Sequence, residues 1–259
     1  MLTFLSNFSP TLLALFGGVF SFFITSLGAI VVFLFKKVNK RLMNSMLSIS
    51  AGIMIATSFF SLIKPAIDIF EQFKQNFFLT IFLGFICGSI FIFIGNIFFK
   101  NINIDSKINL RRCLILFASI TLHNIPEGLA IGVAFGNMMY GGNLIAALTL
   151  TFGIALQNFP EGAAVSLPLR REGLSVKKSF LFGVISGIVE PIFAVVGALL
   201  VLKINFLLSF ILSFAAGAML FVTVLELIPE SQSDEKKDLM AFLFIIGFSL
   251  MMMLDILLG

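Results

Sequence analysis

The stretch HNIPEG at residues 123–128 recurs as QNFPEG at residues 157–162, and each copy lies near the middle of a long apolar run. Each copy therefore places a glutamate and an asparagine where a bilayer-spanning helix tolerates few charged groups. Successive membrane helices run in opposite directions, and a motif shared by two of them is typical of an inverted repeat around a central site. The repeat predicts a helical membrane protein with a polar centre.

The apolar runs around these motifs continue through nearly the whole chain. Hydrophobic residues make up 59% of the 259 residues and charged residues only 12%, about half the charged fraction of a soluble domain. Runs long enough to cross about 30 Å of hydrocarbon as helices occur at residues 12–35, 44–63, 77–99, 113–136, 144–169, 179–202, 206–229 and 239–258. We therefore predict an all-α integral membrane protein in which residues 1–259 form a single domain of eight transmembrane helices.

Basic residues are distributed unevenly between the predicted loops. All but three of the 17 Lys and Arg residues follow the first, third, fifth and seventh runs, and the exceptions are Lys64, Lys74 and Lys203. By the positive-inside rule, the odd-numbered loops lie in the cytoplasm and both termini lie outside. The first basic residue, Lys36, comes too late for a cleavable signal peptide. We expect a multi-pass protein of the cell (plasma) membrane, whose charge of +4 reflects its orientation in lipid rather than a nucleic-acid partner.

Carboxylates inside the predicted spans require partners. Four glutamates lie inside spans and one aspartate lies near the outer end of the last span: Glu127, Glu161, Glu190, Glu226 and Asp255. No Lys or Arg lies in the core of any predicted span, and the only histidine, His123, cannot offset four glutamates. A charge at the bilayer centre costs several kcal/mol. The glutamates therefore either stay protonated and hydrogen-bond neighbouring helices, or a mobile cation supplies the missing charge.

Helical spacing collects the polar residues of each motif on one face. Positions i, i+1 and i+4 of a helix point the same way, which groups His123, Asn124 and Glu127 in one helix and Gln157, Asn158 and Glu161 in the other. Because the two helices run antiparallel, His123 should lie level with Glu161, and Glu127 level with Gln157. The two levels are about 6 Å apart. This spacing predicts a cage of nitrogen and oxygen ligands for one divalent metal ion or two neighbouring ones.

The prolines and glycines of the two motifs fit this arrangement. Pro126 and Pro160 have no N–H group, which frees the carbonyl groups four residues earlier and favours a kink. Free carbonyls at membrane depth are tolerated where the backbone packs in protein or lines a wet cavity. Gly128 and Gly162 permit close approach of other helices.

The remaining small residues and the cysteines are less informative about the fold and the function. Close helix packing is predicted at Gly183, Gly187, Gly217 and Ala218, either within one chain or between the two chains of a homodimer, and both interpretations stay open. Cys87 and Cys113 lack the spacing of a metal site and are predicted to be buried thiols.

Beyond these general features, HNIPEGLAIG and QNFPEGAAVS resemble the fourth and fifth helices of the ZIP (Zrt/Irt-like) family of metal-ion transporters. Three further stretches resemble the GufA-like bacterial branch of that family: AGIMIATSFFSLIKPAID, GIVEPIFAVVGA and LSFAAGAMLFVTVLELIPES. The resemblance covers essentially the whole chain. It implies a single transmembrane transporter domain that takes zinc and related divalent cations, such as iron, manganese and cadmium, into the cytoplasm without an organic cofactor.

The resemblance also implies a binuclear metal site between helices 4, 5 and 6. The implied primary site comprises His123, Glu127, Gln157 and Glu161, and the implied neighbouring site comprises Asn124, Glu127, Asn158, Glu161 and Glu190, with the two shared glutamates bridging. Many family members have His where this chain has Gln157, and some have Asp where it has Asn158. Gln is a weaker, neutral ligand, and Asn removes a charge.

Polar residues nearer the two membrane surfaces suggest a pathway to the cage. Ser61, Asp68 and Asp255 are candidates for an entrance, and Glu226 with Glu230 for an exit. An equally open interpretation of Asp68 and Glu230 is that they are interfacial carboxylates in contact with water.

Three hypotheses about function can be compared on the basis of this sequence. The leading hypothesis is a divalent-metal transporter that alternates access around a midplane site and needs no ATP, because the sequence has no P-loop. The alternative is a proton- or sodium-coupled carrier whose glutamates bind protons and whose activity needs no divalent metal. The third is an intramembrane metalloenzyme, but a zinc protease would require H-E-x-x-H, and the chain has one histidine. We therefore predict a transporter and no enzyme.

Overall fold

The computed structural model describes residues 8–34, 40–73, 78–101, 108–203, 207–233 and 235–258. Within these ranges the chain forms helices and no strand. The helices are α2 (Pro10–Leu34), α3 (Lys40–Ala56), η1 (Thr57–Ile63), α4 (Lys64–Phe73), α5 (Phe78–Asn101), α6 (Ile108–Gly136), η2 (Asn137–Tyr140), α7 (Leu144–Arg171), α8 (Val176–Gly187), α9 (Val189–Lys203), α10 (Leu207–Val222), η3 (Thr223–Leu227), α11 (Ile228–Ser231) and α12 (Lys237–Leu258). The basic loop residues at 36, 37, 74 and 107 lie outside the described ranges.

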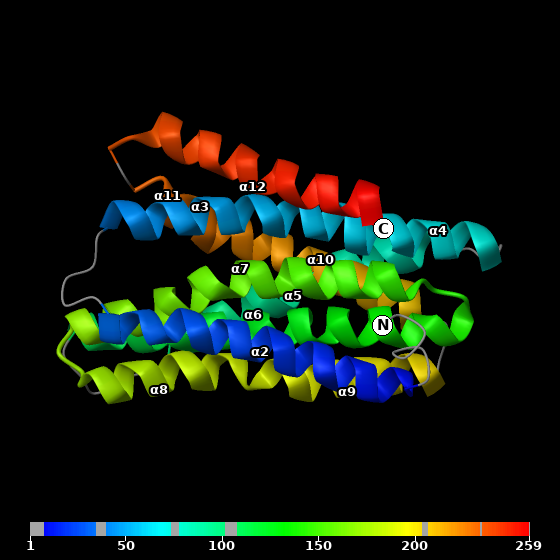
Figure 1. The fold of residues 1–259 in the computed structure, drawn as a ribbon, viewed down its shortest axis with the longest axis horizontal. Coiled ribbons are helices and arrows are strands. Elements are labelled where there is room, and N and C mark those ends of the chain that lie inside the picture. Colours follow the sequence, from blue (N-terminus) through cyan, green and yellow to red (C-terminus); the bar gives the residue numbers. More distant parts are fainter. Residues whose placement is uncertain are drawn as a thin grey trace.

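The long helices lie side by side along the longest axis of the molecule (Figure 1). In one group, α2 packs against α7 and α9, and α6 packs against α9. In the other group, α10 packs against α5, and α12 packs against α3. The first residues of α2 and the last residues of α12 lie toward the same end of the bundle (Figure 1), which is the arrangement expected for an even number of crossings.

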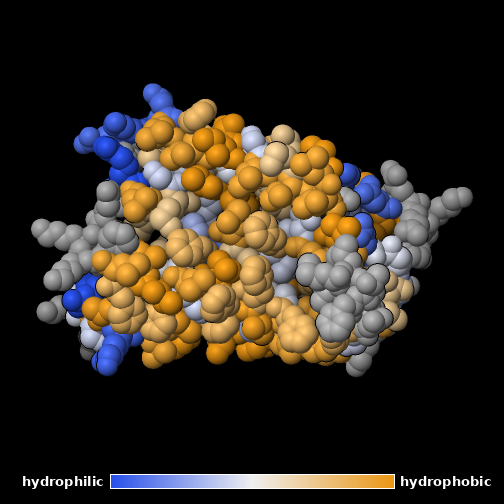
Figure 2. Space-filling model, in the orientation of Figure 1, coloured by the Kyte–Doolittle hydropathy of each residue, from blue (hydrophilic) through white to orange (hydrophobic). Residues whose placement is uncertain are grey.

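The surface of this bundle is suited to lipid. On the face drawn in Figure 2, hydrophobic side chains cover most of the middle, and hydrophilic residues gather toward the two ends. Six helical stretches of the described chain are long and apolar enough to cross a membrane: Pro10–Leu34, Lys40–Ile69, Leu79–Phe99, Val176–Leu202, Leu207–Ser231 and Lys237–Leu258. The protein is therefore an all-α, multi-pass membrane protein. The six stretches do not include α6 and α7, the two helices that carry the polar motifs.

The motif glycines allow close helix contacts around the centre. A Cβ atom at Gly162 would lie 2.0 Å from the carbonyl oxygen of Thr25, and one at Gly128 would lie 2.6 Å from that of Glu190. Only glycine fits such distances, which confirms the predicted close approach. Gly183, Gly187 and Gly217 also face atoms of their own chain.

Cys87 differs from its prediction. Its side chain is exposed on α5, and the thiol is not buried. The reason is that only 22% of the central part of α5 is buried inside the bundle, so most of this helix faces outward. The side chain of Cys113 lies outside the described part of the structure.

Two long helices each contain a π-helical segment that the sequence did not predict. η1 connects α3 to α4, and η3 connects α10 to α11. Pro65 and Pro229 each lie two residues beyond a π segment. Because proline has no N–H group, the carbonyl four residues earlier, inside each π segment, loses its helical partner. This loss gives a physical reason for the helix to widen at both places.

Candidate metal centre

The polar side chains of the two motifs meet between α6 and α7. The Nε2 atom of His123 lies 3.5 Å from Oε2 of Glu161. One level away, Nε2 of Gln157 donates a hydrogen bond of 2.7 Å to Oε1 of Glu127. Both pairings are those expected from two antiparallel copies of the motif, and the structure confirms them. Both motif prolines lie inside continuous helices.

Glu190 joins this group from a third element. The predicted span at 179–202 is divided into α8 and α9 at Ile188, and Glu190 lies in the first turn of α9. The division has a local cause, since Pro191 cannot donate a hydrogen bond to the carbonyl of Gly187. The carboxylates of Glu127, Glu161 and Glu190 lie close enough to repel one another. A broken helix beside polar groups at membrane depth is typical of transporter binding sites.

All seven predicted ligands are buried, with at most 1% of any residue exposed. We call this group the central cluster: His123, Asn124, Glu127, Gln157, Asn158, Glu161 and Glu190. Every member has at least one buried polar atom that lacks a hydrogen-bond partner among the described residues. These atoms are Nδ1 and Nε2 of His123, Oδ1 of Asn124, Oε2 of Glu127, Oε1 of Gln157, Oδ1 of Asn158, Oε1 and Oε2 of Glu161, and Oε2 of Glu190.

Leaving polar atoms unpartnered in a protein interior is unfavourable, at about 1–3 kcal/mol each and more for charged groups. A whole cluster of them in one place therefore points to a polar or charged occupant. Most of these atoms are oxygens, and the group contains three carboxylates but no Lys or Arg. The electrostatics consequently favour a cation. Among the described residues, no three His, Cys, Asp or Glu side chains converge closely enough to hold a metal ion by themselves, so amide oxygens would have to contribute.

Hydrogen bonds between the central cluster and neighbouring residues orient the candidate ligands. Nδ2 of Asn124 donates to the carbonyl oxygen of Ser186 over 2.8 Å, which leaves Oδ1 of Asn124 free. On α2, Ser21 Oγ lies 3.0 Å from Nδ2 of Asn158, and Thr25 Oγ1 donates to Oε1 of Glu190 over 2.8 Å. Sequence reasoning missed Ser21 and Thr25, because hydroxyls in apolar helices usually bond to carbonyls of their own helix.

A cavity of about 430 Å³ leads from the central cluster to one end of α7. We call it the inner cavity. His123 and Glu161 line its buried end, and Glu226, Glu230 and Arg171 line it near the C-terminal end of α7. The predicted exit residues therefore share one cavity with part of the central cluster.

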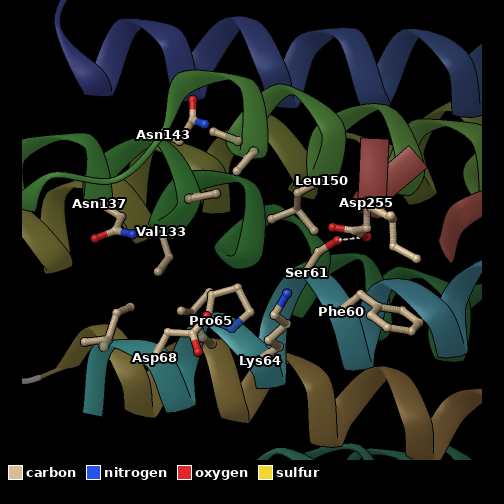
Figure 3. Close-up of a pocket in the computed structure, with 16 residues that line it drawn as sticks. Phe60, Ser61, Lys64, Pro65, Asp68, Val133, Asn137, Asn143, Leu150 and Asp255 are labelled. Atoms are coloured by element: carbon tan, nitrogen blue, oxygen red, sulfur yellow. Dashed lines mark hydrogen bonds between the residues drawn. The ribbon is translucent and has the colours of Figure 1, made fainter. Parts of the chain in front are cut away.

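A second cavity, of about 410 Å³, lies near the opposite, N-terminal end of α7. We call it the outer cavity (Figure 3). Ser61, Asp68 and Asp255 all line it, and Ser61 Oγ donates a hydrogen bond of 2.7 Å to Oδ2 of Asp255. The three predicted entrance residues are thus brought together. No member of the central cluster lines this cavity, whose buried lining includes Val133, Leu150 and Leu212.

Glu226 is held by residues that the sequence did not single out. Ser119 on α6 donates a hydrogen bond to Oε1 of Glu226, and its hydroxyl also lies 2.7 Å from Oδ1 of Asn96 on α5. Ser119 and Asn96 are both buried. Glu226 itself lies in η3, and Ser61 lies in η1. Each π segment therefore carries one of the candidate pathway residues.

The fold and the site together define a class of protein. It is a multi-pass membrane protein with a buried cluster of polar side chains suited to a cation, and with a cavity toward each end of the bundle. The family model described as ZIP Zinc transporter matches residues 104–255, and the chain belongs to this family. It is 31% identical to Zinc transporter ZIP11 of Xenopus tropicalis, over 98% of this chain and 100% of that protein.

Bacterial relatives show the same family. The chain is 35% identical to Zinc transporter ZIPB of Bordetella bronchiseptica, over 95% of this chain and 81% of that protein. It is 39% identical to Zinc transporter GufA of Myxococcus xanthus, over 56% of each chain. These relatives confirm the family inferred from the motifs, which is a family of transporters rather than of enzymes.

Proposed function

We propose that this protein transports divalent metal cations, zinc above all, across the membrane and into the cytoplasm through the central cluster. The observation that carries the proposal is the group of unpartnered polar atoms on seven buried side chains with no fixed Lys or Arg among them. The relatives support the choice of zinc, since they are named zinc transporters. Iron, manganese and cadmium are further candidate cargoes, because imidazole, carboxylate and amide ligands suit borderline to hard divalent ions.

The cluster offers ligands for two neighbouring ions. His123, Glu127, Gln157 and Glu161 would form the primary site. Asn124, Asn158 and Glu190 would complete the neighbouring site, with Glu127 and Glu161 bridging the two. Each ion would relieve the repulsion between these carboxylates. Three hydrogen bonds support this arrangement, because they hold the ligands in place before an ion arrives: Asn158 donates to Ser21, Thr25 donates to Glu190, and Asn124 donates to the carbonyl of Ser186.

The two cavities suggest how the ion moves. We infer that it enters through the outer cavity, at Ser61, Asp68 and Asp255, and leaves through the inner cavity past Glu226. The inner cavity reaches His123 and Glu161, whereas the outer cavity has apolar residues at its buried lining. This asymmetry is the one expected of alternating access, with the cluster open toward one side at a time. With α6 and α7 as additional crossings, the chain would have eight spans.

The test is uptake of radioactive zinc into proteoliposomes that contain the wild-type protein, Glu127→Gln or Glu161→Gln. A matched control is Glu235→Gln, which removes a carboxylate from an exposed position. We expect uptake by the wild type and the control and none by the two cluster variants. If the wild type moves neither zinc, iron, manganese nor cadmium, the proposal fails, and a proton- or sodium-coupled carrier becomes the better explanation of the glutamates.

A further inference from the structure

One lysine faces the carboxylates of the outer cavity. Lys64 is the first residue of α4, three positions after Ser61 and four before Asp68, so the three residues share one side of the helix. Lys64 lines the outer cavity together with Asp68 and Asp255. In Figure 3 its amino group points toward the side of the cavity where Ser61 binds Asp255.

The charge of Lys64 is not neutralised by an ion pair within the described part of the chain. In the part of the chain that the structure describes, its ammonium makes no ion pair and no hydrogen bond. The inner cavity offers a contrast, because the Nε atom of its Arg171 lies 3.5 Å from Oε1 of Glu172. Lys64 is instead close enough for its charge to act on the carboxylate of Asp255. The outer cavity thus contains two carboxylates and one available resident cation.

We propose that Lys64 is a specificity-determining residue of the outer cavity, whose ammonium competes with entering divalent cations for Asp255 and so limits how tightly the cavity holds them. This inference rests on the proposed function, because it treats the outer cavity as the entrance.

The physical reason is the net charge of the cavity. With Lys64 present, the charges of Lys64, Asp68 and Asp255 give the cavity a net charge of −1. Without Lys64, the two carboxylates would give it a net charge of −2 and attract cations more strongly. Hard ions such as Mg²⁺ and Ca²⁺ bind through carboxylate oxygens, so they would gain most from the loss of Lys64. Zinc would still be distinguished deeper in the protein, where His123 supplies a nitrogen ligand. Lys64 therefore keeps abundant hard cations from occupying the entrance.

The first experiment measures zinc uptake by wild type, Lys64→Met and Lys64→Arg in proteoliposomes, with and without external Mg²⁺. Methionine has a similar length and no charge, and arginine keeps the charge. Removing one charge near a bound dication in a wet cavity changes the affinity about three- to tenfold. We expect Lys64→Met to lower the KM for zinc and the inhibitory Mg²⁺ concentration by such factors, and Lys64→Arg to match the wild type. Unchanged values in Lys64→Met would overturn the inference.

A second experiment does not depend on transport. In purified protein with the cluster disabled by Glu161→Gln, Mg²⁺ binding is measured by calorimetry with Lys64 present and with Lys64→Met. We expect tighter binding in the Lys64→Met background, and we expect the gain to disappear when Asp255→Asn is added. A gain that persists without Asp255, or no gain at all, would refute the role of Lys64. Absence of zinc uptake in the wild type would instead count against the proposed function.

Discussion

Gln157 donates a hydrogen bond of 2.7 Å from its Nε2 atom to Oε1 of Glu127, across the interface between the two motif helices. The bond fixes both side chains while Oε1 of Gln157 and Oε2 of Glu127 remain without partners in the described structure. In the proposed primary site, a neutral amide would thus occupy a position where an imidazole would bind zinc more strongly. On the proposed function, Glu127 would be an oriented ligand and Gln157 a weak one, a combination that would favour release of the ion as much as its capture.

The substitution Gln157→His should raise preference for zinc. Imidazole is a better ligand for zinc than for manganese, which prefers oxygen. We expect the KM for zinc to fall about tenfold, the maximal rate to fall because release slows, and the ratio of zinc to manganese uptake to rise. Competition between the two radioactive metals in proteoliposomes measures this ratio, and an unchanged ratio would show that residue 157 does not contact the cargo.

The hydroxyl of Thr25 should matter for the affinity of the cluster. Thr25→Val keeps the shape of the side chain but removes the hydrogen bond to Glu190. A hydrogen bond to a charged group contributes about 1.5–3 kcal/mol, so we expect the KM for zinc to rise about tenfold or more. Thr25→Ser restores the hydroxyl and should restore the KM. If the valine and serine variants behave alike, Thr25 does not position Glu190.

Gly162 should tolerate no side chain. A Cβ atom there would lie 2.0 Å from the backbone oxygen of Thr25, whereas at Gly95 the nearest atom is the flexible end of Leu122, at 2.1 Å. Backbone cannot move aside as a side chain can. We expect Gly162→Ala to destabilise the protein by about 1–3 kcal/mol or more, and Gly95→Ala by less. Thermal unfolding in detergent compares the two, and equal melting temperatures would contradict the predicted α2–α7 contact.

Ser119 should affect release rather than capture. Ser119→Ala removes the hydroxyl that donates to Glu226 in the inner cavity. We expect the maximal rate of zinc uptake to fall several-fold with little change in KM, because the outer cavity and the central cluster keep their residues. Ser119→Thr retains a hydroxyl and is the control. A change in KM with an unchanged maximal rate would place Ser119 outside the exit path.

The pairings in the centre could be predicted because they follow from local rules. Helical spacing and antiparallel direction place His123 beside Glu161 and Gln157 beside Glu127, and the structure shows both pairs. Small residues in the motifs similarly predicted the tight contact at Gly162. The two pairings depend only on the two copies of the motif and on the antiparallel direction of their helices, and a glycine permits close contact whichever helix lies against it.

Two kinds of feature could not be predicted: contacts between residues far apart in sequence, and the way in which a proline changes the helix around it. The hydroxyls of Thr25 and Ser119 act on carboxylates that are far from them in sequence. The break at Ile188 and the two π segments depend on how prolines change hydrogen bonding inside helices. The exposure of Cys87 follows from the outward position of α5, which its uniformly apolar sequence does not reveal.

The presence of a separate cavity toward each end of the bundle also has an electrical consequence for the proposed transport. Val133, Leu150 and Leu212 line the buried part of the outer cavity, and the inner cavity reaches His123 and Glu161 from the other side. If water fills both cavities, most of the transmembrane voltage falls across the part of the protein that separates them. A dication that crosses this part toward a negative interior gains about 4.6 kcal/mol per 100 mV. For the proposed uptake into the cytoplasm, the membrane voltage would then favour accumulation of the dication.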